Sequence, residues 1–175
     1  MLGRIMAGSH AVIAHDDTGH AVCVEYHPPD IHLSQVIVAY CQKVALATGS
    51  ALFVIDRAVN SLAMACAFAQ QGLGLLCMLD DNEHDGLSSL VATEVAILAD
   101  GTRVYSGPWK EARPADPRDF VIVEPAAGKT LVYWGTPQVK DTLEVTQWPM
   151  VYRGRNERFF FCNDTATTEI YTNTN

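Results

Sequence analysis

The stretch from Ala51 to Asn82 constrains the fold more than any other part of the chain, because it reads as strand, helix and strand in close succession. Residues 52–55 form a short continuous apolar run, which is typical of a strand covered on both faces. A helical pattern follows over 58–71, and the apolar run 73–79 predicts a second strand. A crossover of this length favours a right-handed parallel unit, so we expect an α/β fold.

Asp56 stands directly after the first of these strands and is followed by Arg57. Open α/β sheets place their ligand-binding groups at the carboxyl ends of the strands. Two interpretations of Asp56 stay open on this pattern. The carboxylate has a chemical role, or it caps the next helix, which is worth about 1 kcal/mol. Asp80, at the end of the second strand, is a weaker candidate for lining the same site.

The residues before this unit predict a β-hairpin and a helix. Alternating runs over 10–15 and 20–26 flank the sequence DDTG at 16–19, which supplies hairpin turn chemistry. The segment Pro28-Pro29-Asp30 ends the second strand and opens a helix that is expected to run to about Thr48, where Gly49 closes it.

Beyond Asp81 the pattern changes to short alternating runs separated by Gly and Pro turns, which predicts a small antiparallel β unit over 82–148. Three tryptophans lie in this unit. For them we prefer packing in a core, with stacking on a nucleic-acid base as the alternative. The expected strands cover residues 94–98, 102–105, 120–124, 130–134 and 143–147.

The last stretch departs from the rest of the sequence. Residues 163–172 read NDTATTEIYT, and all ten agree with the frame-one translation of a common flow-cell sequencing adapter. We therefore expect residues 158–175 to be an adapter-derived, disordered tail, and the gene to be cut near Arg158. Everything from about that residue is excluded from fold predictions, as a fusion scar would be.

Composition sets further limits on function. A chain of 175 residues is long enough for one domain with a sizeable core. Its net charge of −8 argues against binding to nucleic acid by this chain alone, because phosphate contacts need a basic surface. The five cysteines include no C-x-x-C pair, which indicates a reducing compartment. No apolar run approaches the ~20 residues of a membrane span, and no signal peptide is evident.

Together these elements resemble the bacterial insertion-sequence transposases of the DDE type, whose catalytic core is ribonuclease H-like. The resemblance covers about residues 1–157. It implies an incomplete ribonuclease H-like core over 1–81, made of the hairpin, a helix and the parallel strand–helix–strand. A β-rich insertion over 82–148 and the start of the returning catalytic helix over 149–157 would follow.

The resemblance places the family's second catalytic aspartate at Asp56. Its third carboxylate lies on a helix with the pattern Tyr, two residues, Arg, three residues, Glu, six residues, Lys. Tyr152 and Arg155 match the start of that pattern, but Phe159 stands at the Glu position and Ala166 at the Lys position. Both departures lie at or beyond the proposed cut. Glu157 is a poor substitute, because two residues turn about 200° around a helix.

The family's first aspartate sits on a strand before the hairpin. No strand is evident before Gly3, so we expect that aspartate upstream of Met1. Asp16 and Asp17 are alternatives, and we interpret them as residues of a tight turn. The chain is thus expected to be truncated at both ends.

The resemblance implies Mg²⁺-dependent DNA cleavage and strand transfer, in which two metal ions about 4 Å apart activate the attacking oxygen and neutralise the leaving oxygen. Asp56 would bind the metal, and Arg57, Tyr152 and Arg155 would contact DNA. The partners would be the transposon ends and further copies of the chain, without a membrane, in the bacterial cytoplasm at the nucleoid. With one matched carboxylate, we expect this chain to be inactive.

Two alternatives stay open. The first is a non-catalytic α/β binding or interaction domain, in which Asp56 would cap its helix. The second, less favoured, is a phosphoreceiver with Asp56 as the phosphate acceptor. Such modules need an acidic pair at the end of their first strand, and this sequence does not have one there.

Overall fold

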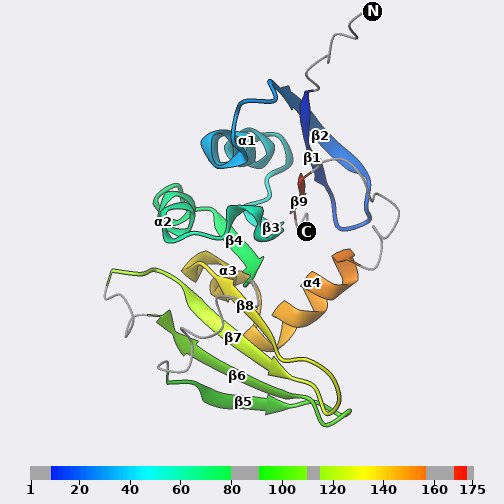
Figure 1. The fold of residues 1–175 in the computed structure, drawn as a ribbon, viewed down its shortest axis with the longest axis vertical. Coiled ribbons are helices and arrows are strands. Elements are labelled where there is room, and N and C mark those ends of the chain that lie inside the picture. Colours follow the sequence, from blue (N-terminus) through cyan, green and yellow to red (C-terminus); the bar gives the residue numbers. More distant parts are fainter. Residues whose placement is uncertain (1–8, 80–90, 110–114, 157–167, 173–175) are drawn as a thin grey trace, which may run out of the picture.

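The computed structural model describes residues 9–79, 91–109, 115–156 and 168–172, and these residues form a mixed α/β fold around a single sheet (Figure 1). This confirms the predicted α/β class. Among the helices of these ranges, none combines the length and the apolar character that crossing a membrane requires.

The N-terminal half follows the predicted order of hairpin, helix, strand, helix and strand. Its elements are β1 (His10–His15), β2 (Ala21–His27), α1 (Leu33–Thr48), β3 (Leu52–Ile55), the 3-10 turn η1 (Arg57–Val59), α2 (Leu62–Gln70) and β4 (Gly74–Met78). The hairpin strands are antiparallel, and β3 and β4 are parallel, as expected. Gly49 ends α1 with a φ of 76°, a conformation that glycine adopts at little cost.

The C-terminal half contains four of the five predicted strands. These are β5 (Thr93–Ile97), β6 (Arg103–Pro108), β7 (Asp119–Glu124) and β8 (Leu131–Gly135), each antiparallel to the next. The fifth, expected over 143–147, is wrong. That region instead holds α3 (Pro137–Thr142), the 3-10 turn η4 (Val145–Gln147) and the start of α4 (Trp148–Asn156).

The physical reason lies in Pro137 and in the apolar side chains of that region. Proline at the first helical position has the φ that a helix needs and has no N–H to leave unpaired. Leu143 and Val145 then pack against the core from the turns around η4, so their alternation in sequence does not produce a strand.

The strands lie in the order β2-β1-β9-β3-β4-β8-β7-β6-β5. The predicted β-rich unit is therefore antiparallel but does not form a sheet of its own, because β8 pairs with β4 and extends the sheet of the N-terminal half. Thr136 strengthens this junction, since its hydroxyl accepts a 2.9 Å hydrogen bond from the backbone N–H of Leu75.

The strand β9 (Thr168–Thr172) lies in the interior of this sheet, parallel to β1 and antiparallel to β3. The expectation that 158–175 would be disordered is therefore wrong for these residues. Two strands that face each other across a gap offer unpaired N–H and C=O groups to an extended segment, and the β-branched and aromatic residues of β9 favour extension. The rest of the tail lies outside the described residues.

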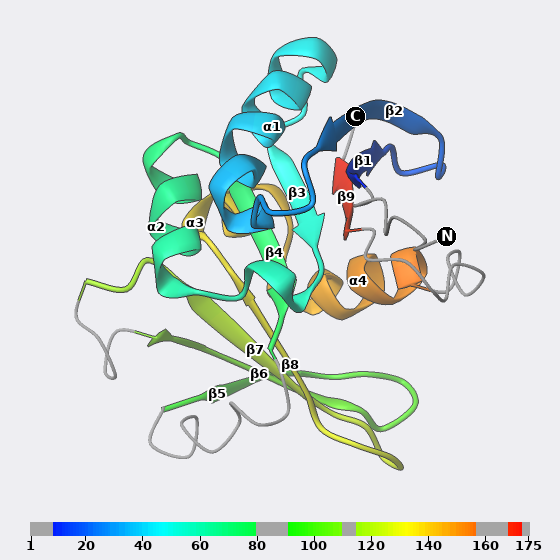
Figure 2. The same ribbon diagram turned by 45° about the horizontal axis from the view of Figure 1, so that its top comes forward.

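Two hydrophobic layers cover the two faces of the sheet. On one face, α1 and α2 pack against Phe53, Ile55 and Leu75. On the other face, Val139 of α3 and residues of α4 pack against Leu52 and Val54. Figure 2 shows α1 and α2 together on one side and α4 next to the end of β3. All four residues of β3 are buried, as the continuous apolar run predicts.

Tyr40 of α1 joins the helix layer to the hairpin. Its hydroxyl accepts a 2.9 Å hydrogen bond from the backbone N–H of Ala14 and donates a 2.7 Å bond to the carbonyl oxygen of Cys23. Ala14 and Cys23 are partners in the hairpin register, and the register shifts just after Ala14. The hydroxyl thus bridges two backbone groups at a β-bulge. Burial raises the pKa of Tyr40 well above its ordinary value.

Candidate functional site

Asp56 is exposed at the carboxyl end of β3, although the strand itself is buried. The cap of α2 is Ser61, whose hydroxyl accepts a 3.2 Å hydrogen bond from the backbone N–H of Met64. Asp56 therefore does not cap α2, and it directly precedes the 3-10 turn η1 instead.

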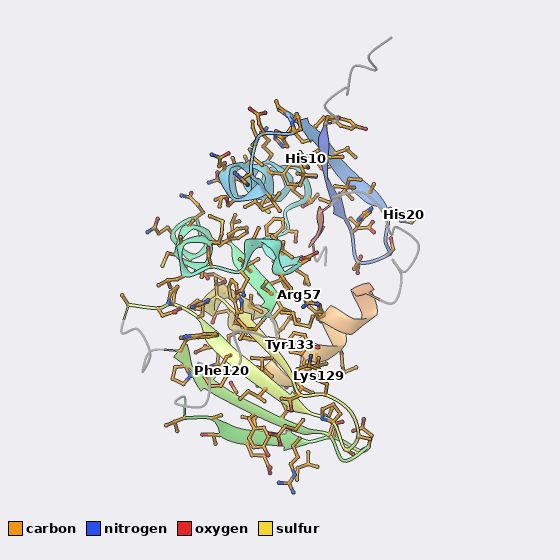
Figure 3. All side chains as sticks on the ribbon, viewed as in Figure 1. His10, His20, Arg57, Phe120, Lys129 and Tyr133 are labelled. Carbon is orange, nitrogen blue, oxygen red and sulfur yellow. The ribbon has the colours of Figure 1, made fainter. Side chains whose placement is uncertain are left out.

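Helix α4 brings Tyr152 to this end of the sheet. Tyr152 is buried and packs on Tyr133 of β8, with ring centroids 5.3 Å apart. Burial is the main cause that raises its pKa well above the ordinary value; the nearby charge of Asp56 raises the pKa further, and Arg57 lowers it. Figure 3 shows Arg57 and Tyr133 close to α4. The structure thus brings together Asp56, Arg57 and Tyr152.

The burial of Tyr152 changes the role expected for it. Only 5% of the residue is exposed, so most of its side chain packs α4 against the sheet. Arg57 is exposed and directly follows Asp56. The side chain of Arg155 lies outside the described part of the structure, as do Asp80, Glu157, Phe159 and Ala166.

The turn interpretation of Asp16 is confirmed. One carboxylate oxygen of Asp16 accepts hydrogen bonds from the backbone N–H groups of Thr18 and His20 and from the hydroxyl of Thr18. These bonds close the β1–β2 turn, and the Thr18 hydroxyl is the largest cause that lowers the pKa of Asp16 to about 2.

Two of the three tryptophans belong to the core. Trp134 and Trp148 have no exposed surface, which confirms core packing and makes base stacking wrong for both. Trp109 is half-buried and packs edge-on against Phe120, with centroids 6.1 Å apart.

Asp116 and Arg118 form a buried ion pair that no sequence pattern indicated. Arg118 donates to both carboxylate oxygens of Asp116, at 2.9 Å from Nε and 2.7 Å from Nη2, and the two side chains are 6% and 0% exposed. The guanidinium lies over the rings of Trp109 and Trp134, at 4.2 and 5.1 Å. The indole N–H of Trp134 in turn donates a 2.7 Å bond to Asn60, which follows η1. This cluster fixes the loop after Asp56 to the sheet.

The carboxylate of Asp56 is suited to a hard cation, since Mg²⁺ prefers carboxylate oxygens and water as ligands. Within the described residues, no three His, Cys, Asp or Glu side chains come together as a metal-binding group.

No protein-family model matches this chain, and a comparison with curated proteins found no match.

Proposed function

We propose that this chain is a fragment of a DDE transposase, and that its sheet contains an incomplete ribonuclease H-like core with a β-rich insertion. The order of elements supports this proposal. A hairpin and a helix precede the parallel β3–α2–β4 unit, four antiparallel strands follow, and α4 then returns to the end of β3. This is the order of elements that the resemblance implies for residues 1–157.

One observation carries the proposal most directly. Asp56 is exposed at the carboxyl end of a fully buried strand, and Tyr152 of the returning helix lies close enough for the charge of Asp56 to raise its pKa. A structural aspartate that only closed a turn would not need a helix from nearly a hundred residues later at the same place. The two segments that match the family's motifs, FVIDR with Asp56 and the helix with Tyr152, thus also lie close together in the fold.

The proposed chemistry depends on the carboxylate of Asp56 and the guanidinium of Arg57. Asp56 would hold Mg²⁺, which when bound activates a water or 3′-hydroxyl and neutralises the leaving oxygen. Arg57 would contact a DNA phosphate, since a guanidinium matches phosphate geometry. Arg155 is assigned to DNA by its place in the pattern. The net charge of −8 makes DNA binding by this chain alone weak. Because only one of the family's three catalytic carboxylates is matched, the chain would be inactive.

A titration with Mn²⁺ tests the assignment, because this paramagnetic ion broadens the NMR signals of nearby amides. We expect broadening at Asp56, Arg57 and their neighbours on β4, and its loss in Asp56→Asn. Asp141→Asn, an exposed aspartate on α3, is the matched control and should leave the broadening unchanged. Broadening that survives Asp56→Asn would contradict the metal role and favour a non-catalytic α/β domain.

Two further assays separate the rivals. The purified chain should show no Mg²⁺-dependent nicking of supercoiled DNA, and nicking would refute the predicted inactivity. Incubation with acetyl phosphate followed by mass spectrometry should find no phosphate on Asp56; an aspartyl phosphate there would favour the phosphoreceiver.

A further inference from the structure

The interior position of β9 is unusual for a segment of its composition. It pairs with β1 from Val12 to His15 and with β3 from Phe53 to Ile55, so it closes the gap between the hairpin and the rest of the sheet. Figure 1 shows it between these two strands. Without a strand in this slot, the facing edges of β1 and β3 would have unpaired backbone groups.

The neighbours of β9 define what the slot favours. All of β3 is buried, and Val12 and Ala14 of β1 belong to the core that α1 covers. A strand between covered strands normally reads as a continuous apolar run. The sequence of β9 is TEIYT, in which three of five residues are Thr or Glu. The same residues agree with the translated adapter. The slot is thus more apolar than the strand that fills it.

We propose that the slot between β1 and β3 is an acceptor site for an extended, predominantly aliphatic peptide strand, and that β9 is an exchangeable occupant. Recognition would combine backbone hydrogen bonds to both neighbouring edges with apolar side chains against the core, as in β-strand addition. A peptide with Val and Ile at successive positions fits this slot better than TEIYT does. The inference goes beyond the proposed function and does not depend on it.

The test uses the full-length chain and a fluorescein-labelled peptide, KTVIVVTK. Ile170→Pro should weaken β9, because proline has no N–H for the ladder. We expect the peptide to bind this variant at least tenfold more tightly than the unchanged chain in fluorescence anisotropy. Asn175→Pro, outside β9, is the matched control and should bind like the unchanged chain. The peptide KTVPVPTK should bind to none of them.

A second measurement covers the case in which Ile170→Pro fails to fold by circular dichroism. Excess KTVIVVTK added to the unchanged chain should speed hydrogen exchange of the amides of residues 168–172, while those of α1 stay protected. Unchanged protection of 168–172 in that experiment would overturn the proposal. So would a folded Ile170→Pro chain that binds KTVIVVTK no better than KTVPVPTK.

Discussion

Tyr152 lies on α4, next to the end of β3, and the charge of the Asp56 carboxylate contributes to raising the pKa of this buried tyrosine. This relationship joins the parallel strand–helix–strand unit to a helix that begins only after the four antiparallel strands. It can be tested by changing the charges around Tyr152 one at a time.

Asp56→Asn should lower the pKa of Tyr152, because it removes a negative charge that disfavours the tyrosinate. Arg57→Gln should raise it further, because it removes a stabilising positive charge. Burial is the largest cause, so in both variants the pKa should stay above the ordinary value of 10.0. Titration of the tyrosine ring carbons by NMR measures this. Equal curves for Asp56→Asn and Asp141→Asn in the folded chain would contradict an electrostatic effect of Asp56 on Tyr152.

Tyr40→Phe should destabilise the chain by about 1–3 kcal/mol, because it leaves the backbone N–H of Ala14 and the carbonyl of Cys23 without their buried partner. Unfolding in urea, followed by circular dichroism, measures the change. Tyr26→Phe is the matched control, since Tyr26 is 71% exposed, and it should have little effect. A similar loss in both variants would contradict a specific role for the Tyr40 hydroxyl.

Asp116→Asn should cost about 3–5 kcal/mol, because it leaves the Arg118 guanidinium buried without a counter-charge. Asp119→Asn offers a control at a more exposed pair, in which Lys140 is 3.3 Å away and 56% exposed. That change should cost less than about 1 kcal/mol. Guanidinium chloride unfolding of both variants measures the difference, and similar midpoints would indicate that the buried pair is not required.

The β1–β2 turn should lose stability in acid. The pKa of Asp16 falls to about 2 in the folded chain from an ordinary 3.8. The contribution of its carboxylate is therefore complete above about pH 3.8, and it is lost as the pH falls towards 2. NMR of the Asp16 carboxyl carbon should give a midpoint near 2. Asp16→Asn keeps an oxygen acceptor without the charge, and its thermal stability should lose this part of the pH dependence.

The elements predicted most reliably were those whose pattern is local. The run at 52–55 is apolar throughout because β3 is covered on both faces, and DDTG at 16–19 gives the turn because Asp16 bonds to backbone groups within four residues. Both signals lie in a few consecutive residues. The glycine turns expected between the alternating runs are equally local, and one of them, at Gly128, joins two paired strands with a φ of 116°.

The features that sequence reasoning missed depend on residues far apart in the chain. Nothing near Asp116 indicates that Arg118 will lie under two tryptophans, one of them sixteen residues later. Leu143 and Val145 alternate like a strand, but Pro137 before them begins a helix and turns the chain. The pairing of residues 168–172 was not predicted, because the tail was excluded from the fold predictions as adapter-derived. A strand edge pairs through backbone groups, which every residue except proline supplies in full.

The junction of β4 with β8 has a consequence for engineering this chain. Separating the two halves would leave an unpaired strand edge on each, because β4 of the N-terminal half pairs with β8 of the C-terminal half. A chimaera that borrows the antiparallel half would also need a donor strand in the place of β4. A deletion of that half would in turn have to shield the newly bared edge of β4 before the remainder could stay in solution.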